Sequence, residues 1–352
     1  MEQASTTLLI GVFLFAVVVT WIAGIFLSDC TDVIDDRLHL GEALGGLILL
    51  GIAGTLPEIA ITVSGAMSGN LGLVTGNLLG GIAMQTLVLV LLDGISRSPT
   101  PLSTMSTVLE PIVEAVFVII LVTMALLGPL LPPSSAIGPA SPISILIVVT
   151  WFGGLLILNR VRKTERWTVA SRHLESAMMV KAAPPAKPAR PNRFERSGSG
   201  RVVAAFLFAA GATLAGGVAL EETSNALANR WGINGVIFGA TVLAAATALP
   251  EISTGIRAVQ LGQVGLAMGD IFGGNQIQLT LFLVADLVAG GPVLQTVAPN
   301  SAWLGGIGVI VTALFLAGLV IRPQRKVLGL GPDSLLVLLA YALGLVGLAK
   351  VS

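Results

Sequence analysis

The sequence predicts an all-α integral membrane protein with ten transmembrane helices arranged as two inverted five-helix repeats. Three observations support this fold class. Of 352 residues, 54% are hydrophobic and only 11% are charged, whereas soluble domains have roughly 25% charged residues. A basic, proline-containing segment separates the apolar stretches into two equal sets. The two sets share a motif at a constant offset of 193 residues.

The ten spans follow from the lengths of the apolar stretches, because a helix needs about 20 residues to cross a bilayer. Polar and turn residues such as Ser68-Gly69-Asn70 separate them. The expected spans are 7–28, 40–67, 70–92, 107–131, 142–159, 202–221, 232–258, 263–290, 302–321 and 333–349. The first apolar run begins near Leu8 with no basic residue before it. This favours a membrane helix over a cleavable signal peptide.

Residues 160–201 are predicted to form a cytoplasmic linker between an N-terminal repeat, 1–159, and a C-terminal repeat, 202–352. The linker contains 11 of the 19 Lys and Arg residues, and cytoplasmic loops carry an excess of such cations. With five spans on each side, both termini lie outside and 17 of the 19 cations lie inside. We therefore expect a plasma (inner) membrane protein whose basic linker faces anionic lipid and binds no nucleic acid.

An acid-bearing segment occurs twice, at about 45–93 and about 238–286. Leu56-Pro57-Glu58 in the first copy corresponds to Leu249-Pro250-Glu251 in the second, and 13 of the 43 positions between 51 and 93 are identical after the shift. Because each half has five spans, the second half enters the membrane from the opposite side. The two glutamates are therefore expected to face each other near the midplane across a pseudo-two-fold axis.

Neither glutamate has a basic residue close to it within its apolar stretch. The nearest is Arg257, six residues after Glu251. A carboxylate in the hydrocarbon region costs from about 2.5 kcal/mol upward unless it is paired, protonated or bound to a cation. We expect an exchangeable cation, or a proton in its absence, and a protonated structural glutamate is the alternative. One cysteine and two histidines exclude a disulfide and a Cys- or His-rich metal site.

The other candidate ligands supply oxygen atoms. Hard cations bind carboxylate, amide, hydroxyl and backbone carbonyl oxygens, and the two prolines free carbonyls in the preceding turn. The predicted cation-binding residues are Glu58, Glu251, Gln85, Gln278, Thr55, Thr247, Asn77 and Asp270. The glutamine pair has the alternative of bridging helices, and Asp270 has the alternative of lining a vestibule. The nearby glycines have small-xxx-small spacing, which predicts close helix packing.

Several other acidic residues are expected to lie at helix ends. Asp93 and Asp286 are expected to be structural. Glu110 and Glu114 indicate a solvated helix start or a face where cations arrive. Glu221-Glu222 is interpreted in the same way, as the solvated outer end of the sixth span or a face where cations arrive.

The duplicated motif resembles that of the calcium/cation antiporter superfamily, which includes the membrane region of sodium/calcium exchangers. Each inverted repeat of that superfamily carries a Gly-Thr-Ser-Leu-Pro-Glu-like stretch, followed on the next helix by a Gly-Asn-x-x-Gly-Ser-Asn-like stretch. The matching stretches are Ala53-Gly54-Thr55-Leu56-Pro57-Glu58 with Gly76-Asn77-Leu78-Leu79-Gly80-Gly81, and Ala246-Thr247-Ala248-Leu249-Pro250-Glu251 with Gly269-Asp270-Ile271-Phe272-Gly273-Gly274-Asn275. The resemblance implies a cation site between the two repeats.

The motif is intermediate between two branches of that superfamily. Sodium/calcium exchangers place Thr and Ser hydroxyls before Pro-Glu, and this chain lacks one hydroxyl in each repeat. They also carry Asn or Asp where this chain has Gln85 and Gln278. A glutamine here is similar to the Gly-Ser-Ala-Thr-Gln stretch of proton/calcium exchangers, which usually lack the proline.

These features predict a secondary antiporter that exchanges Ca2+, or a similar divalent cation, for H+ or Na+ by alternating access. The expected partners are the lipid bilayer and the transported cations, with no cofactor. The sequence has no nucleotide-binding motif and no nucleophile with its base, which argues against an enzyme. A monovalent Na+/H+-type antiporter on the same scaffold, a cation channel and a non-transporting membrane protein are the alternatives.

Overall fold

The computed structural model describes residues 4–38, 49, 51–163 and 193–351, and their secondary structure is helical apart from two isolated bridges. The N-terminal half contains α1 (Thr6–Leu38), α3 (Leu56–Met67), α4 (Leu71–Ile95), α5 (Leu102–Met105), α6 (Glu110–Leu127) and α7 (Pro142–Lys163). The C-terminal half contains α9 (Ser199–Trp231), α10 (Gly235–Phe238), the π-helical turn η4 (Gly239–Leu243), α11 (Ala244–Thr247), α12 (Leu249–Gln260), α13 (Val264–Ala289), α14 (Pro299–Ile321) and α15 (Pro332–Val351). Short 3-10 turns, η2 (Gly128–Leu130), η3 (Pro133–Ser135) and η5 (Val293–Thr296), lie in the loops.

The helices correspond in order to the ten predicted spans. Among the described residues, seven helices are long and apolar enough to cross a membrane, and the bent pair Gly235–Thr247 and Leu249–Gln260 adds an eighth if it is one span. The shorter apolar helices α3 and α15 occupy the positions of the second and tenth spans. Residues 39–48 and 50 of the second span, and 164–192 of the predicted linker, lie outside the described residues.

Two of the predicted span boundaries are wrong. α1 continues to Leu38 rather than ending at residue 28, and α9 continues to Trp231 rather than ending at residue 221. The polar residues that suggested an end, Asp29 in α1 and Glu221 in α9, are buried against neighbouring helices. A polar residue therefore interrupts the apolar pattern in both helices without ending the helix.

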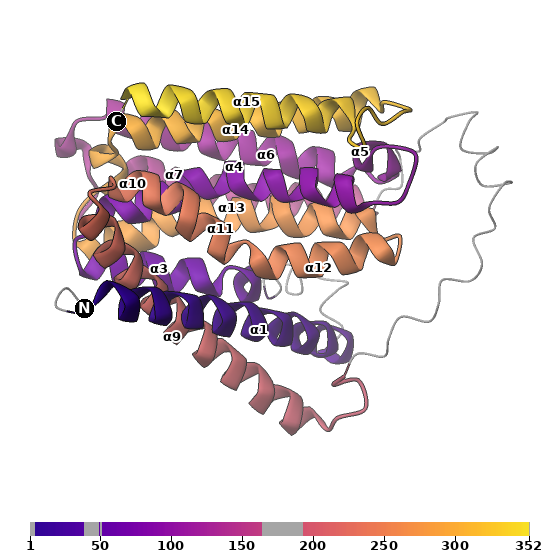
Figure 1. Ribbon diagram of the computed structural model, residues 1–352, viewed down its shortest axis with the longest axis horizontal. Coiled ribbons are helices and arrows are strands. Elements are labelled where there is room, and N and C mark those ends of the chain that lie inside the picture. The colour runs from indigo at the N-terminus through magenta and orange to yellow at the C-terminus, as the bar shows by residue number, and fades with distance from the viewer. Residues whose placement is uncertain (1–3, 39–48, 50, 164–192, 352) are drawn as a thin grey trace, which may run out of the picture.

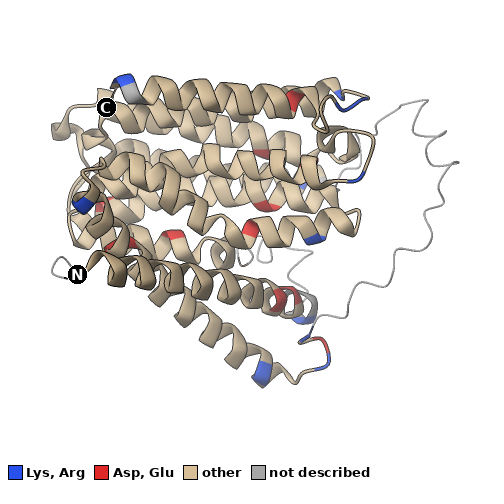
Figure 2. Cartoon of the chain, in the orientation of Figure 1, with Lys and Arg blue, Asp and Glu red and all other residues tan. Residues whose placement is uncertain are grey.

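The helices run roughly along one common direction, with both termini at the same end of the bundle (Figure 1). α1 packs along α9 on one side, α14 and α15 form the opposite side, and α4 and α13 lie between them. α4 and α13 are also the most buried of the long apolar helices. Basic residues lie mainly at helix ends, whereas several acidic residues lie part-way along the helices (Figure 2).

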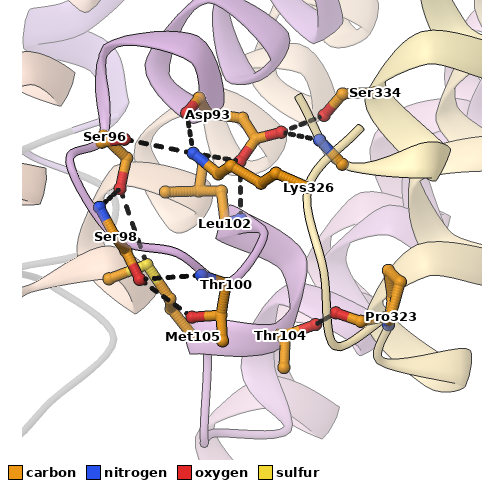
Figure 3. Close-up of polar contacts among 11 residues, drawn as sticks. Asp93, Ser96, Ser98, Thr100, Leu102, Thr104, Met105, Pro323, Lys326 and Ser334 are labelled. Atoms are coloured by element: carbon orange, nitrogen blue, oxygen red, sulfur yellow. Dashed lines mark hydrogen bonds and ion pairs between the residues drawn. The ribbon is translucent and has the colours of Figure 1, made fainter. Parts of the chain in front are cut away.

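An aspartate at the end of each central helix ties the two repeats together. Asp93 in α4 accepts hydrogen bonds from the backbone N–H groups of Leu102 (2.8 Å) and Gly331 (2.6 Å). It also pairs with Lys326, whose Nζ lies 3.2 Å from Oδ1 (Figure 3). In α13 the equivalent Asp286 accepts from the backbone N–H groups of residues 141 and 293, at 2.8 and 2.7 Å. The structural role expected for both aspartates is confirmed.

Removing the Asp93 charge is predicted to destabilise the fold. Asp93→Asn leaves Lys326, whose side chain is only 10% exposed, without its anionic partner, and breaking a buried pair costs about 3–5 kcal/mol. We expect a lower midpoint of thermal unfolding in detergent. The double variant Asp93→Asn/Lys326→Met removes the unpaired cation and is expected to recover part of the loss. A double variant as unstable as the sum of the two single variants would contradict the ion-pair explanation.

Candidate cation-binding site

Each glutamate lies in the first turn of a helix that begins at a break. α3 begins at Leu56 and α12 at Leu249, and each has proline as its second residue and the glutamate as its third. Proline is tolerated there because the N–H that it lacks has no helical partner. The axis of Gly235–Thr247 is bent by 44° from that of α12. Both carboxyl groups therefore lie at the positive end of a helix dipole, which favours negative charge.

The two glutamates are buried without a compensating cation. Glu58 is 1% exposed and Glu251 is 8% exposed, and neither belongs to an ion pair among the described residues. Arg257, the nearest basic residue in sequence, pairs with Asp29 at 3.4 Å instead. Glu251 lies close enough to Glu58 for the two charges to repel each other. Their negative charge therefore has no protein counter-ion within the part of the chain that the structure describes.

Carboxylate oxygens also remain without hydrogen bonds. Within the described ranges, neither oxygen of Glu58 has a partner, and Oε2 of Glu251 has none. The Thr247 hydroxyl faces Glu58 but donates to the carbonyl of Ala244 at 3.3 Å. The Thr55 hydroxyl likewise donates within its own helix, to the carbonyl of Gly51 at 3.0 Å. Each hydroxyl oxygen keeps its lone pairs, so the ligand roles of Thr55 and Thr247 stay predictions.

The glutamine pair is asymmetric although the two residues are related by the repeat. Gln85 Nε2 donates to Gln278 Oε1 at 3.1 Å, and Gln278 Nε2 donates to the carbonyls of Asn77 and Leu78 at 3.1 and 3.0 Å. Gln278 therefore bridges α13 to α4 with both ends of its amide. Gln85 Oε1 is buried and has no hydrogen-bond partner among the described residues. Of the two glutamines, only Gln85 has a side-chain oxygen that accepts no hydrogen bond from the described residues.

Glycines allow the helices around the site to approach closely. A Cβ added to Gly76 would lie 2.4 Å from the Val236 carbonyl oxygen, and one added to Gly80 would lie 2.3 Å from the Ala240 Cβ. A Cβ at Gly81 would lie 2.4 Å from Gln278 Nε2. The packing role predicted for these glycines in the first repeat is confirmed, and Gly81 in particular leaves room for the glutamine bridge.

A small open cleft reaches Glu251. Its lining residues come from α1, the α3 break, α12 and α13: Gly24, Ser28, Ala53, Gly54, Pro57, Pro250, Glu251, Thr254 and Asp270. Asp270 is half-buried and accepts a hydrogen bond from the Thr254 hydroxyl at 2.9 Å. α12 runs from Glu251 away from the end of the bundle that holds both termini (Figure 1). The cleft therefore opens toward the end where α12 meets α13, and Asp270 lines it.

Comparison with known proteins identifies the family. The sequence profile described as "Sodium/calcium exchanger protein" matches residues 8–159 and 201–349, which is most of the chain. The chain belongs to the sodium/calcium exchanger family. This is a family of membrane cation/calcium antiporters, so the superfamily resemblance and the expectation of a transporter rather than an enzyme are both confirmed.

Relatives of this exchanger-family chain are distant. The Inner membrane protein YrbG of Escherichia coli is 24% identical over 68% of this chain and 66% of its own length. The Putative antiporter CaxA of Alkalimonas amylolytica is 22% identical over 88% of this chain and 89% of its own. Among solved structures, the H+/Ca2+ exchanger CAX has a TM-score of 0.67 at 15% identity, covering 97% of this chain and 86% of that one. The sodium-calcium exchanger NCX_Mj has a TM-score of 0.57 at 14% identity, covering 97% and 99%.

These structural matches share the fold of this exchanger-family chain. They are ten-helix inverted-repeat transporters, which confirms the predicted fold class. The chain is an integral membrane protein. Among its described residues, no group of three or more His, Cys, Asp or Glu side chains forms a resident metal site.

Sequence reasoning missed one buried polar residue, Asn275, and misjudged another, Glu114. Asn77 and Asn275 are both buried with no partner for either amide atom within the described ranges, and only Asn77 was predicted as a ligand. The position of Asn275 in the second motif was the available signal. Glu114 is buried on α6 rather than solvated, and its carbonyl accepts from Gln276 at 3.2 Å.

The solvated helix end expected at Glu221 is also wrong. This carboxylate is 0% exposed and accepts hydrogen bonds from the Ser64 hydroxyl (2.8 Å) and the Asn70 amide (2.7 Å). Its neighbour Glu222 is exposed, as expected. The reason is helical periodicity, because adjacent residues on a helix point in different directions and only Glu221 faces α3.

The asymmetry of the glutamine pair predicts different effects of matched substitutions. Gln278→Leu loses three hydrogen bonds at about 1 kcal/mol each and is expected to lower the thermal midpoint in the absence of added cation. Gln85→Leu loses one and removes the free oxygen. We expect Gln85→Leu to have its main effect on stabilisation by calcium. The rise in thermal midpoint that added Ca2+ produces, measured in detergent across a calcium titration, is expected to be smaller than in the unmodified protein. Equal effects of the two substitutions on both quantities would contradict the asymmetric assignment.

Proposed function

We propose that this protein exchanges Ca2+, or a similar divalent cation, for protons or sodium by alternating access. The observation that supports it most directly is the pair of buried, repeat-related carboxylates, Glu58 and Glu251, without a protein counter-ion among the described residues. Two carboxylates match the charge of one divalent cation. In a membrane interior such a pair is stable only with a cation or with protons bound.

The oxygen inventory around the pair supports a hard cation. Ca2+ takes 6–8 oxygen ligands at 2.3–2.6 Å from carboxylates, amides, carbonyls and water. Besides the two carboxylates, the neighbouring helices α4 and α13 offer the free oxygen of Gln85 and the buried amides of Asn77 and Asn275. Two of the structural relatives are titled as a proton/calcium and a sodium-calcium exchanger.

The same inventory favours the proton over sodium as the counter-ion. Gly54 and Ala248 stand where the first motif of sodium/calcium exchangers carries a hydroxyl, and Gly81 and Gly274 stand where the second motif carries serine. Few hydroxyl ligands are therefore left for sodium. Departure of the divalent cation exposes two buried carboxylates to mutual repulsion, which favours protonation.

Alternating access is supported by how α1 and α9 contact the site. α1 and α9 pack extensively on each other. α9 also contacts α3, which carries Glu58, and α1 contacts α12, which carries Glu251. The cleft extends from Glu251 along α12 to Asp270 of α13, toward the end of the bundle opposite both termini. We infer that this end is cytoplasmic, with both termini outside and the chain in the inner membrane. A sliding movement of α1 and α9 would close this cleft and open the opposite side.

Flux measurements test the proposal directly. In inverted vesicles, calcium uptake is measured with a proton gradient and with a sodium gradient imposed separately. We expect uptake driven by the proton gradient, and loss of at least about tenfold in Glu58→Gln and Glu251→Gln, because each removes one of the two charges that bind the cation. Glu222→Gln, which removes an exposed charge, is the control and is expected to transport normally.

Other results would identify the alternatives. Intact calcium exchange in both site variants would refute the assignment of the site. Response to sodium without any response to calcium would identify a monovalent antiporter. Calcium flux that needs no counter-ion would identify a channel, and absence of flux with any of these cations would identify a non-transporting protein.

A further inference from the structure

The helices α1 and α9 contact the site prolines at equivalent glycines. A Cβ added to Gly24 in α1 would lie 2.9 Å from Pro250 Cβ. A Cβ added to Gly217 in α9, which is 193 residues later, would lie 2.9 Å from the Pro57 carbonyl oxygen. The contact of α1 with α12 is therefore repeated, with inverted direction, by the contact of α9 with α3. Adding 193 to a residue number on the α1 side of the site therefore gives the equivalent residue on the α9 side.

This mapping predicts which residues line the access path on the closed side. The open cleft is lined by Ser28, one turn after Gly24, and by Asp270. Adding 193 to position 28 gives Glu221, and subtracting 193 from position 270 gives Asn77. Each path thus receives one acidic residue beyond the site glutamate. The acid lies on α13 in the open path and on α9 in the closed path.

Glu221 is buried at the contact between α9 and α3. Its two oxygens accept hydrogen bonds from Ser64 and Asn70, both neutral donors. It belongs to no ion pair within the described part of the chain. Gly65 lies beside it, because a Cβ added there would be in ordinary van der Waals contact with Glu221 Cγ at 3.5 Å, although it would clash with Val74 Cγ2 at 2.4 Å. Burying a carboxylate costs free energy that a neutral hydrogen-bond acceptor at the same position would avoid. A purely structural link between α9 and α3 would therefore not require an acid.

We propose that Glu221 is the acidic residue of the outer vestibule. In the arrangement described here Ser64 and Asn70 close over it. When α9 moves along α3, Glu221 lines the outer path and exchanges cations with the external solution, as Asp270 does on the inner path. Ser64 lies six residues beyond Glu58, about 9 Å along the helix axis, so the vestibule leads toward that glutamate. This inference rests on the proposed transport function.

Side-specific transport measurements test the inference. The concentration of Ca2+ giving half-maximal flux is measured from each side in right-side-out and inverted vesicles. Glu221→Gln is expected to raise the external value about fivefold, the effect of losing one charged contact of about 1 kcal/mol, with the internal value unchanged. Asp270→Asn is expected to raise only the internal value, and Glu222→Gln neither. Equal changes on the two sides for Glu221→Gln would overturn the proposal and indicate a structural link.

Thiol labelling provides a second readout that does not depend on calcium transport. Cys30 is the single native cysteine and is buried, so Cys30→Ala gives a background without thiols. The thiol introduced by Glu221→Cys is expected to react with a membrane-impermeant cationic methanethiosulfonate from the external side only. Ser64→Ala, which removes one closing contact, is expected to accelerate that reaction. Reaction from the cytoplasmic side, or from neither side even with Ser64→Ala, would overturn the proposal.

The two readouts separate this inference from the proposed function. If Glu221→Cys is labelled from outside but the unmodified protein shows no calcium flux, the vestibule role of Glu221 stands and calcium exchange is refuted. Normal calcium flux with no external labelling would refute the vestibule and retain the exchange.

Discussion

The uncompensated charge of Glu58 and Glu251 is the constraint on which the rest of the site depends. Both carboxylates lie at helix starts, where backbone N–H groups and the helix dipole favour negative charge, and both are buried without an ion pair among the described residues. A dipole offsets only part of the cost of burying a charge. A bound cation or a proton must offset the rest of this free-energy cost. The buried carboxylates are therefore stable only when one of the two is present.

Close helix packing gives this site its geometry. Glycines bring α4 against the Val236–Ala240 segment, and Gly81 leaves room for the amide of Gln278. A larger residue at Gly81 would displace the glutamine that joins the two repeats and orients Gln85. The glycines therefore affect the proposed cation site indirectly, by fixing which amide oxygen remains free.

The helices and the duplicated motif were predictable from the sequence because both depend on local pattern. Apolar length sets a span, and thirteen identities at a fixed offset reveal the repeat. The state of Glu221 was not predictable, because its partner Ser64 lies 157 residues away and burial depends on which face α9 turns toward α3. The asymmetry of Gln85 and Gln278 was hidden for a related reason. Identical residues at equivalent positions indicate equal roles, and only the packing of α4 against α13 distinguishes them.

The differences between the repeats carry as much functional information as their identities. A perfectly symmetric duplication would give the two access paths the same residues, and the two directions of exchange would then face the same chemistry. Here Ser28 and Glu221 occupy one pair of equivalent positions, and Asn77 and Asp270 occupy another. In the first pair the acid belongs to the path lined by α9, and in the second pair the acid belongs to the path lined by α13. Each path therefore has one acid, but the two acids lie on different helices. An antiporter needs both paths to admit a cation, and under the proposed vestibule role of Glu221 this exchange of positions meets that need.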